Sequence, residues 1–476
     1  MRIIKKTPYL TLILVFFFIF LLFQVKDPRA SSSKSKVLEA SLPFVPQTTG
    51  NFFSQDENSY YALFEKKMFL LDADFKIKSS LVFARDVSAF DFGDINGDKM
   101  DDLIELSVNG IYVRYQMNPA VFGGRTKLPI NENLFVPYNA IDLERLSLGY
   151  DIDNDSDFDL ILPGIGRMFY YENNKSRWVK QKELPFEFKS KFSDRVWKNS
   201  DRRSNTITAK SYVPRIYFKD INNDGIIDAF CRVETAIYFY TSRKISATQT
   251  KAFANIAIKV FPVELEDVYA SFFEVADLDN DGHFELIFSI IKGLGLKIRT
   301  EIFVFKGENY LPNPKKKIFY EQPGGFFAPL VVQFKSKPML IIPTINPGVG
   351  FFINYIVRRK LSISAVFLNI VNSKIEEETS VSLSFDVEGN LFPGFTVGDY
   401  DNDSYSDFIL GHQLKEIEIY RGNDDLDVDS WMTLSLPGYG ILKTVKSPSN
   451  RDELLIYLPQ LIKEYDRKKI YLIRFE

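Results

Sequence analysis

The sequence is poor in the residues that most often form cross-links or carry out catalysis. Its 476 residues include one cysteine, two histidines and three tryptophans. A single cysteine excludes an intramolecular disulfide, so the fold has to be held by its core, by bound metal or by both. Cys231 lies in an apolar run directly after an acidic loop, and we expect it to be a packed core thiol rather than a reactive one.

Recognisable catalytic and cofactor motifs are missing as well. The sequence has no GxSxG, no HExxH and no phosphate-binding glycine loop, and neither His283 nor His412 lies near a nucleophile pattern. The formal net charge of −3 gives no reason to expect nucleic-acid binding. The sequence therefore identifies no catalytic and no cofactor-binding residue. It favours a protein without enzymatic activity but does not decide the question.

The first thirty residues have the pattern of a targeting segment. Basic residues among the first six precede an apolar run from Leu10 to Leu22. Such a pattern is typical of a cleaved signal peptide or a short uncleaved anchor. We predict residues 1–30 to be this signal or anchor, 31–43 to be a polar tether and 44–476 to be the folded part. The protein would then be secreted, periplasmic or on the cell surface, and would meet a membrane only through its first segment.

One short acidic motif occurs five times. In its most regular copy, Asp277–Leu286 (DLDNDGHFEL), acidic residues stand at positions one, three, five and nine, and glycine stands at position six. The other copies begin at Asp94, Asp151, Asp220 and Asp399, and each is followed by an apolar run typical of a β-strand. In chain order we call the nine-residue copies loops one to five, so that the copy at Asp277 is loop four. This density of oxygen ligands, with a glycine that allows a tight turn, predicts a site for a hard cation such as Ca²⁺.

The spacing of the motif predicts a repeat fold. The copies start 57, 69, 57 and 122 residues apart, and segments near 329–342 and 442–456 fit two further copies that have lost the loop. Short β-type runs, with no convincing amphipathic helix, occupy the rest. We therefore predict an all-β protein, a β-propeller of seven blades closed by pairing of the hairpin Tyr60–Leu71 with Ile470–Phe475. Counting that hairpin as a blade of its own gives eight.

At these loops the chain resembles the FG-GAP/VCBS repeat family, which forms the propeller of integrin α-subunits and occurs in many exported bacterial proteins. The residues that carry the resemblance are Phe92–Asp98 with Asp102 and Leu103, and Val397–Asp403 with Asp407 and Phe408. The resemblance extends from about residue 50 to 476. The Gly-Ala-Pro that ends the family pattern is reduced here, and position six is not glycine in three of the five loops.

The resemblance and the ligand chemistry together imply one metal site in each loop. The side chains at positions one, three, five and nine and the main-chain carbonyl at position seven would bind the ion. We expect up to five Ca²⁺ ions with a structural role, each fastening two adjacent strands. The predicted metal ligands are Asp94, Asn96, Asp98, Asp102, Asp151, Asp153, Asp155, Asp159, Asp220, Asn222, Asp224, Asp228, Asp277, Asp279, Asp281, Glu285, Asp399, Asp401, Asp403 and Asp407.

The sequence thus predicts an exported, calcium-binding, monomeric propeller that acts as a binding or adhesion module for a protein or glycan it does not identify. The alternative is a polysaccharide-acting enzyme or a lectin on the same propeller. A basic segment, Lys189–Arg215, carries Trp197 among arginines and is either a binding loop or a solvated insertion without function. Residues 346–372 are apolar enough that we interpret them as blade strands.

Overall fold

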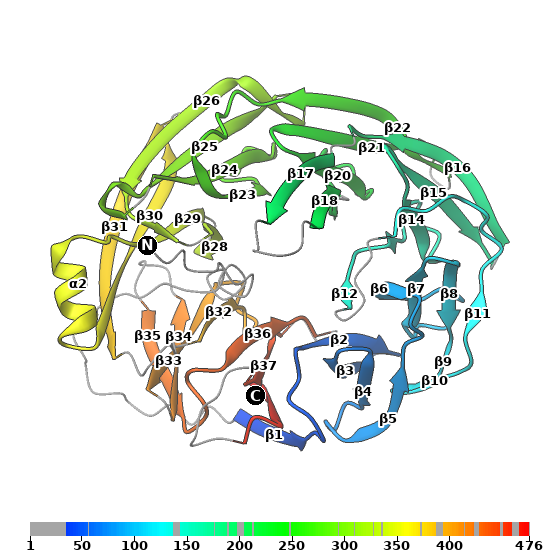
Figure 1. The fold of residues 1–476 in the computed structure, drawn as a ribbon, viewed down its shortest axis with the longest axis horizontal. Helices are drawn as coiled ribbons and strands as arrows, with labels where there is room; N and C mark the ends of the chain where they lie inside the picture. Colours follow the sequence, from blue (N-terminus) through cyan, green and yellow to red (C-terminus); the bar gives the residue numbers. More distant parts are fainter. Residues whose placement is uncertain are drawn as a thin grey trace.

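The computed structural model shows a ring of eight small antiparallel sheets, or blades, which we number in chain order (Figure 1). The first strand of a blade lies nearest the centre of the ring and the fourth at its perimeter. The residues described are 35–55, 57–136, 143–175, 177–187, 190–197, 204–211, 214–246, 249–293, 295–308, 310–326, 328–334, 337–371, 374–386, 394–413, 415–422, 428–447, 451–458 and 466–475.

Blades one to four are each built on four antiparallel strands, and blade two has a fifth, parallel strand. Blade one holds β2 (Thr48–Ser54), β3 (Glu57–Phe64), β4 (Lys67–Leu71) and β5 (Ile77–Val82). Blade two holds β6 (Val87–Gly93), β7 (Asp102–Ser107), β8 (Gly110–Arg114) and β11 (Thr126–Lys127), with β12 (Glu144–Arg145) parallel to β6 and a small hairpin of β9 (Gln116–Asn118) and β10 (Val121–Phe122). Blade three holds β13 (Gly149–Tyr150), β14 (Asp159–Pro163), β15 (Arg167–Asn174) and β16 (Arg177–Pro185). Blade four holds β19 (Ile216–Lys219), β20 (Asp228–Val233), β21 (Ala236–Ser246) and β22 (Gln249–Val260).

Blades five to eight complete the ring. Blade five holds β23 (Val268–Ala276), β24 (Glu285–Lys292), β25 (Arg299–Glu308) and β26 (Leu311–Pro323). Blade six holds β27 (Gly325–Phe326) and β28 (Leu330–Phe334), which both pair with β29 (Lys337–Ile345), then β30 (Lys360–Val371) and β31 (Lys374–Asp386). Blade seven holds β32 (Phe395–Gly398), β33 (Asp407–Gln413), β34 (Glu416–Gly422) and β35 (Val428–Leu434). Blade eight holds β36 (Ile441–Val445), β37 (Glu453–Tyr457), β38 (Lys469–Phe475) and β1 (Ser35–Ser41).

Of the two predicted blade counts, eight is confirmed and the favoured seven is wrong, and the predicted closure is wrong as well. The hairpin β3–β4, which covers Tyr60–Leu71, pairs with β2 and β5 and forms blade one. The C-terminal strand β38 pairs instead with β1, from Ser35 opposite Phe475 to Ser41 opposite Lys469. Residues 35–41, which their polar composition placed in a tether, are therefore the perimeter strand of blade eight. Because β1 pairs with β38, a strand from before blade one closes the ring, and β38 is not left as an unpaired edge.

The hydrophobic core lies between the blades. Seven clusters of buried side chains are found among the described residues, and each draws its members from two neighbouring blades. At the closure, Tyr60 and Leu71 of blade one pack with Leu455 and Ile470 of blade eight. Cys231 belongs to the cluster between blades three and four and is fully buried, and burial raises its pKa to about 12. The prediction of a packed core thiol is confirmed.

Two insertions interrupt the repeat. The first is a hairpin of β17 (Ser190–Trp197) and β18 (Ser204–Ser211), which accounts for most of the basic segment Lys189–Arg215. The second is helix α2 (Val349–Ile356), between β29 and β30. The interpretation of residues 346–372 as strands is therefore wrong for the helix and correct for β30, because apolar composition alone does not distinguish a short helix from a strand. No helix in the described part of the chain is long and apolar enough to cross a membrane.

The alternation of strand direction gives the ring two different faces. Connections from first to second and from third to fourth strands emerge on one face, which carries the five acidic loops, and we call it the acidic-loop face. Connections from second to third strands and the links between blades emerge on the other, which we call the link face. Helix α2 and the hairpin β17–β18 both belong to the link face.

Candidate metal centres

The five acidic loops occupy the same place in five blades. They join β6 to β7, β13 to β14, β19 to β20, β23 to β24 and β32 to β33. Position nine of every loop is the first residue of the second strand: Asp102, Asp159, Asp228, Glu285 and Asp407. The repeat predicted from the sequence therefore corresponds to one structural element, the connection between the first two strands of a blade.

The carboxylate at position nine links its loop to the third strand of the same blade. All five side chains are fully buried. One oxygen accepts a hydrogen bond from the backbone N–H at position two of the loop, over 3.2, 3.2, 3.1, 2.8 and 2.9 Å in loops one to five. The other oxygen accepts from a backbone N–H in the last part of the third strand or, in loop one, two residues after its end, over 2.8, 2.9, 2.7, 3.4 and 3.1 Å; the donors are Gln116, Asn173, Ser242, Gly307 and Gly422. Position nine is thus a structural clamp as well as a predicted metal ligand.

Positions one and five fold each loop back on itself. In loop two, for example, Asp151 accepts hydrogen bonds from the backbone N–H groups of Asp155 (3.1 Å) and Ser156 (3.0 Å), and Asp155 accepts from that of Asp157 (2.9 Å). The backbone has a positive φ at positions four and six of all five loops. Position six keeps this conformation where it is not glycine, as at Ser156 with φ of 74°. The glycine expected there from the sequence is therefore a preference of the fold and not a requirement.

Position three separates the loops into two groups. In loops two, four and five it is an aspartate, and three carboxylates in each of these loops place one oxygen within 4.8 Å of the others. These groups are Asp151, Asp153 and Asp155; Asp277, Asp279 and Glu285; and Asp399, Asp401 and Asp407. One buried oxygen each of Asp153, Asp279 and Asp401 makes no hydrogen bond. A buried carboxylate oxygen without a donor costs free energy, and a bound cation would remove that cost. These three donor sets fit a divalent metal ion.

Several predicted ligands are not part of these groups. Asp159, Asp281 and Asp403 belong to the same three loops but stand outside the sets of three. Loops one and three have an amide at position three, and none of their carboxylates forms such a group in the described residues. In loop one the side-chain amide of Asn96 donates to Asp98 (3.0 Å), and its carbonyl oxygen accepts from the Asp98 backbone (3.1 Å). The remaining predicted ligands of these two loops are Asp94, Asp102, Asp220, Asn222, Asp224 and Asp228.

A residue on the third strand distinguishes the three carboxylate groups from one another. It directly precedes the strand residue that donates to position nine, and it is Glu172 in loop two, Lys306 in loop four and Arg421 in loop five. Lys306 lies 2.6 Å from Asp279, and Arg421 lies 2.7 Å from Asp401. The hydrogen bond to Asp279 raises the pKa of Lys306. In loops four and five, a positively charged side chain of the protein itself therefore pairs with the aspartate at position three.

Loop two has an additional carboxylate where loops four and five have a cation. Among the described residues, no lysine or arginine forms an ion pair with loop two, and Glu172 is bonded to Gln181 (2.7 Å). The pKa of Asp153 is raised to about 7, first by burial and then by the charges of Asp155 and Glu172. Burial and the charge of Asp153 raise the pKa of Asp159 to about 8. Loop two thus carries the most negative charge that no side chain of the protein compensates, and a bound cation would stabilise it most.

Sequence reasoning did not find these third-strand residues. Glu172, Lys306 and Arg421 follow position nine by 13, 21 and 14 residues. The spacing varies because the second and third strands and the connection between them differ in length from blade to blade. Only the strand register identifies the residue that lies beside position three.

Blade eight keeps the buried acidic residue and replaces the acidic loop. Glu453 begins its second strand, as position nine does elsewhere. It accepts a hydrogen bond from the guanidinium of Arg474 over 2.7 Å, a second from Asn58 over 3.0 Å and a third from the hydroxyl of Tyr60. Arg474 lies on the third strand, in the place of Lys306 and Arg421. The partner of the Glu453 carboxylate is therefore a cation of the protein itself. In the sequence, the acidic pair Asp452-Glu453 ahead of an apolar run marked the position of this buried carboxylate.

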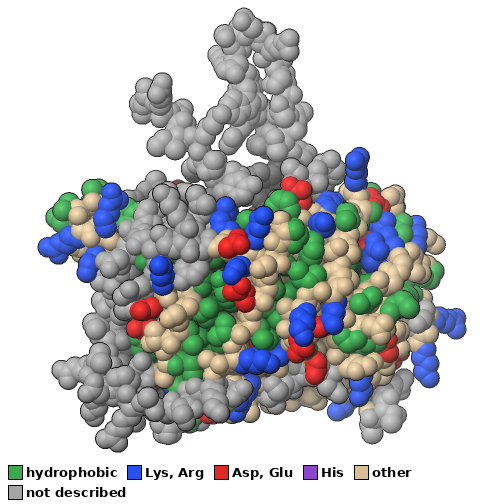
Figure 2. All heavy atoms as spheres, turned by 90° about the horizontal axis from the view of Figure 1, so that it is seen from below, with side chains coloured by type: hydrophobic (Ala, Val, Ile, Leu, Met, Phe, Trp, Pro, Cys, Tyr) green, Lys and Arg blue, Asp and Glu red, His purple; other side chains and the backbone are tan. Residues whose placement is uncertain are grey.

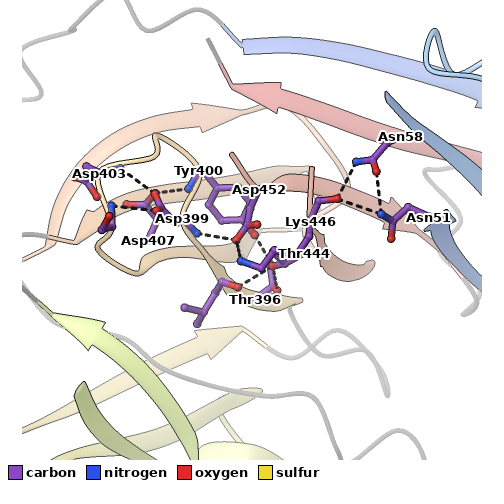
Figure 3. A network of polar contacts seen from close by, with 12 residues as sticks. Asn51, Asn58, Thr396, Asp399, Tyr400, Asp403, Asp407, Thr444, Lys446 and Asp452 are labelled. Carbon is purple, nitrogen blue, oxygen red and sulfur yellow. Dashed lines mark hydrogen bonds and ion pairs between the residues drawn. The ribbon is translucent and has the colours of Figure 1, made fainter. Parts of the chain in front are cut away.

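A polar network joins this region to loop five (Figure 3). The Asp452 carboxylate accepts from the backbone N–H of Asp399 (2.9 Å) and from Lys446 (2.8 Å), and the Asp452 N–H donates back to the Asp399 carbonyl (2.9 Å). The Lys446 carbonyl accepts from the amides of Asn51 (3.1 Å) and Asn58 (2.9 Å) of blade one. Loop five, blade eight and blade one are thus connected by hydrogen bonds, and the first residue of a predicted metal site is part of that connection.

The known proteins that resemble this chain do so in structure, at low sequence identity. No protein-family model and no curated protein matches the chain. Two solved structures are similar over most of their length. An Agrocybe aegerita lectin, described as recognising non-reducing terminal N-acetylglucosamine, has a TM-score of 0.40 at 13% identity, covering 84% of this chain and 94% of the lectin. The V. cholerae biofilm matrix protein Bap1 has a TM-score of 0.36 at 11% identity, covering 92% of this chain and 87% of Bap1.

Proposed function

We propose that this protein is an exported, calcium-binding propeller of the FG-GAP/VCBS type whose ring presents a binding surface to a protein or glycan. The observation that carries the calcium proposal is the group of three carboxylates in each of loops two, four and five, which place oxygens within 4.8 Å of one another. In each group the position-three aspartate also has a buried oxygen without a hydrogen bond. Ca²⁺ accepts an irregular shell of oxygen ligands, including main-chain carbonyls, and so suits short loops of this kind better than Mg²⁺.

The role proposed for the metal is structural. A bound ion would connect positions one, three and five, at the end of the first strand, to position nine, at the start of the second. Loops two, four and five would bind calcium through side chains, whereas the amides at position three of loops one and three predict weaker sites. The binding role of the ring is supported by its rigid repeated frame, on which two insertions project from the link face.

Export is proposed from the basic and apolar pattern of residues 1–30, which lie outside the described residues. A location outside the cytoplasm also fits calcium binding, because extracellular calcium modules work at dissociation constants of about 10⁻⁴–10⁻³ M.

The calcium proposal can be tested by isothermal titration of metal-free protein with Ca²⁺ and by thermal unfolding with and without chelator. We expect at least three binding events and a higher melting temperature in Ca²⁺. An unchanged melting curve together with no heat of binding would contradict the proposal. A glycan array probed in Ca²⁺ and in chelator would then test the proposed binding role, and cleavage of a bound glycan would identify an enzyme instead.

A further inference from the structure

Helix α2 presents aliphatic side chains to solvent. Ile353 is 49% exposed, Ile356 is 63% exposed and Val357, directly after the helix, is 74% exposed. The rings of Phe351 and Tyr355 stack on each other at 5.7 Å between centroids. In Figure 1 the helix stands at the perimeter of the ring, beside blade six. Exposed aliphatic groups gathered on one short helix are unusual on a soluble surface and indicate a contact site.

The chain around the helix is strongly basic. Arg358, Arg359 and Lys360 follow it and are exposed. No aspartate or glutamate occurs between Glu321 and Glu376, although the chain has 62 acidic residues in total. Six basic residues lie in that interval: Lys335, Lys337, Arg358, Arg359, Lys360 and Lys374. In the edge-on view of Figure 2, hydrophobic and basic side chains gather next to one another at the left end of the molecule, where α2 lies.

The neighbouring blade repeats this combination on the same face. The connection between the second and third strands of blade five contains Leu296, which is 63% exposed, and Lys297, which is also exposed. Blades five and six share a hydrophobic cluster, so the two connections belong to adjacent, packed blades. Leu296 and Lys297 therefore lie on the same face as α2, one blade away, and we call α2, Val357 and the three basic residues that follow the α2 patch.

We propose that the α2 patch docks on the surface of a lipid bilayer that contains anionic lipids. Aliphatic side chains on a short helix gain free energy by entering the boundary between headgroups and acyl chains, and adjacent arginines and lysines are attracted by anionic headgroups. An anionic polysaccharide would attract the same charges but offers no hydrocarbon in which isoleucine and valine could be buried. The patch lies on the face opposite the acidic loops, whose negative charge would be repelled by such a membrane.

Vesicle co-sedimentation tests this proposal. The chain from residue 31 onward keeps every described strand, including the β1–β38 closure, and lacks the apolar segment that would itself bind lipid. We expect this protein to bind vesicles containing about a third phosphatidylglycerol in phosphatidylcholine at least about tenfold more tightly than pure phosphatidylcholine vesicles, with the difference reduced at high salt. Equal, weak sedimentation with both vesicles would overturn the proposal.

Two variants and a matched control locate the contact. Arg358→Glu with Arg359→Glu, and separately Ile356→Ser with Val357→Ser, should each weaken binding to the anionic vesicles about tenfold or more. The control is Arg243→Glu with Lys244→Glu, which changes two exposed basic residues beside the exposed Ile245 on the acidic-loop face. An equal loss in the control would show unspecific charge attraction and overturn the proposal. Unchanged melting curves would show that the variants are folded.

A label at the patch distinguishes insertion from other contacts. The single native cysteine is fully buried, so Val357→Cys would provide one accessible thiol for an environment-sensitive dye. We expect a blue shift of the dye emission with anionic vesicles and none with soluble anionic polysaccharide. A blue shift that instead rises with protein concentration in the absence of vesicles, together with a dimer on gel filtration, would assign the patch to a second copy of this chain and overturn the proposal.

Discussion

Loop two and loop four have the same backbone arrangement but balance their negative charge in different ways. Both place an aspartate with an unbonded oxygen at position three and a buried carboxylate at position nine. Lys306 pairs with position three of loop four, whereas the equivalent residue of loop two is Glu172. One side chain on a neighbouring strand thus determines how much of the charge remains for a metal ion to neutralise. Blade eight is the limiting case, because Arg474 binds the buried carboxylate and no acidic loop is left.

The largest effect should come from removing metal from all loops at once and varying the pH. The pKa values of Asp159 and Asp407 are raised to about 8, and those of Asp102 and Asp228 to about 7, in each case mainly by burial. In the unfolded chain these groups ionise near pH 4. The folded protein therefore binds more protons between about pH 4 and 8, and its stability must fall as the pH rises through that window.

We expect metal-free protein to lose on the order of several kcal/mol of stability between pH 6 and pH 8, measured by denaturant unfolding in chelator. Saturating Ca²⁺ should remove most of this dependence, because a bound metal stabilises the ionised carboxylates. The same pH dependence in Ca²⁺ and in chelator would contradict the assignment of these carboxylates to metal sites.

The next largest effect should follow the loss of the protein cation in blade eight. Arg474→Ala leaves the buried Glu453 without its charged partner, and we expect a loss of about 3 kcal/mol in the free energy of unfolding. The loss should be the same in Ca²⁺ and in chelator, because no acidic loop is involved. Arg167→Ala, which breaks an exposed pair with Glu183, is the control and should cost less than about 1 kcal/mol. Rescue of the Arg474 variant by Ca²⁺ would show that blade eight also binds metal.

A substitution at position three should have opposite effects in the two loops. In chelator, Asp153→Asn should stabilise the protein by about 1 kcal/mol, because it relieves repulsion in loop two. Asp279→Asn should destabilise it by a similar amount, because Lys306 loses its partner. In Ca²⁺ at a hundredfold excess over Kd, loss of an occupied site costs about 2.7 kcal/mol, so both variants should then be less stable than the parent. If both substitutions stabilised the protein in chelator, or both destabilised it, the proposed difference between loops two and four would be refuted.

Exchanging the third-strand residues should have a smaller effect than the loss of an occupied metal site. Glu172→Lys gives loop two the charge arrangement of loop four, and we expect calcium binding there to weaken about tenfold, which corresponds to about 1.4 kcal/mol. Lys306→Glu should strengthen binding at loop four. Titration calorimetry measures both, with Glu172→Gln as the control that removes charge without adding a cation and should give an intermediate result. Affinities that do not follow this order would mean that the third-strand charge does not control the sites.

The sequence was sufficient to predict the repeat and where its loops would fall. Acidic residues in register with apolar runs identified five connections between first and second strands, because the acidic pattern and the start of a strand share position nine. The short β-type runs that follow the loops in the sequence also form strands: those at 111–115, 168–171, 236–240, 301–305 and 417–420 lie, to within one residue, inside the third strands of their blades. These features depend on residues close together in the chain.

Features that depend on distant residues were not predictable. Blade one has only a short connection between β2 and β3 in place of an acidic loop, so no motif marked it and the favoured count of seven blades was one too low. β1 is a polar strand (SKVLEAS) at the perimeter of the ring, and its composition is that of a linker. The pairing of Lys306 with Asp279, or of Arg474 with Glu453, follows from strand register, which the spacing in the sequence does not give.

The pairing of β1 with β38 has a consequence for how the chain reaches its folded state. A polypeptide made from its N-terminus cannot complete blade eight until residues 469–475 have been synthesised, so the apolar flanks of blades one and eight stay unpaired until the end. Contacts between such distant residues form slowly, because a long chain segment must be closed first. The nascent chain therefore has a long interval in which chaperones and proteases can act on it, and deletion of β1 or of β38 would return the finished protein to that vulnerable state.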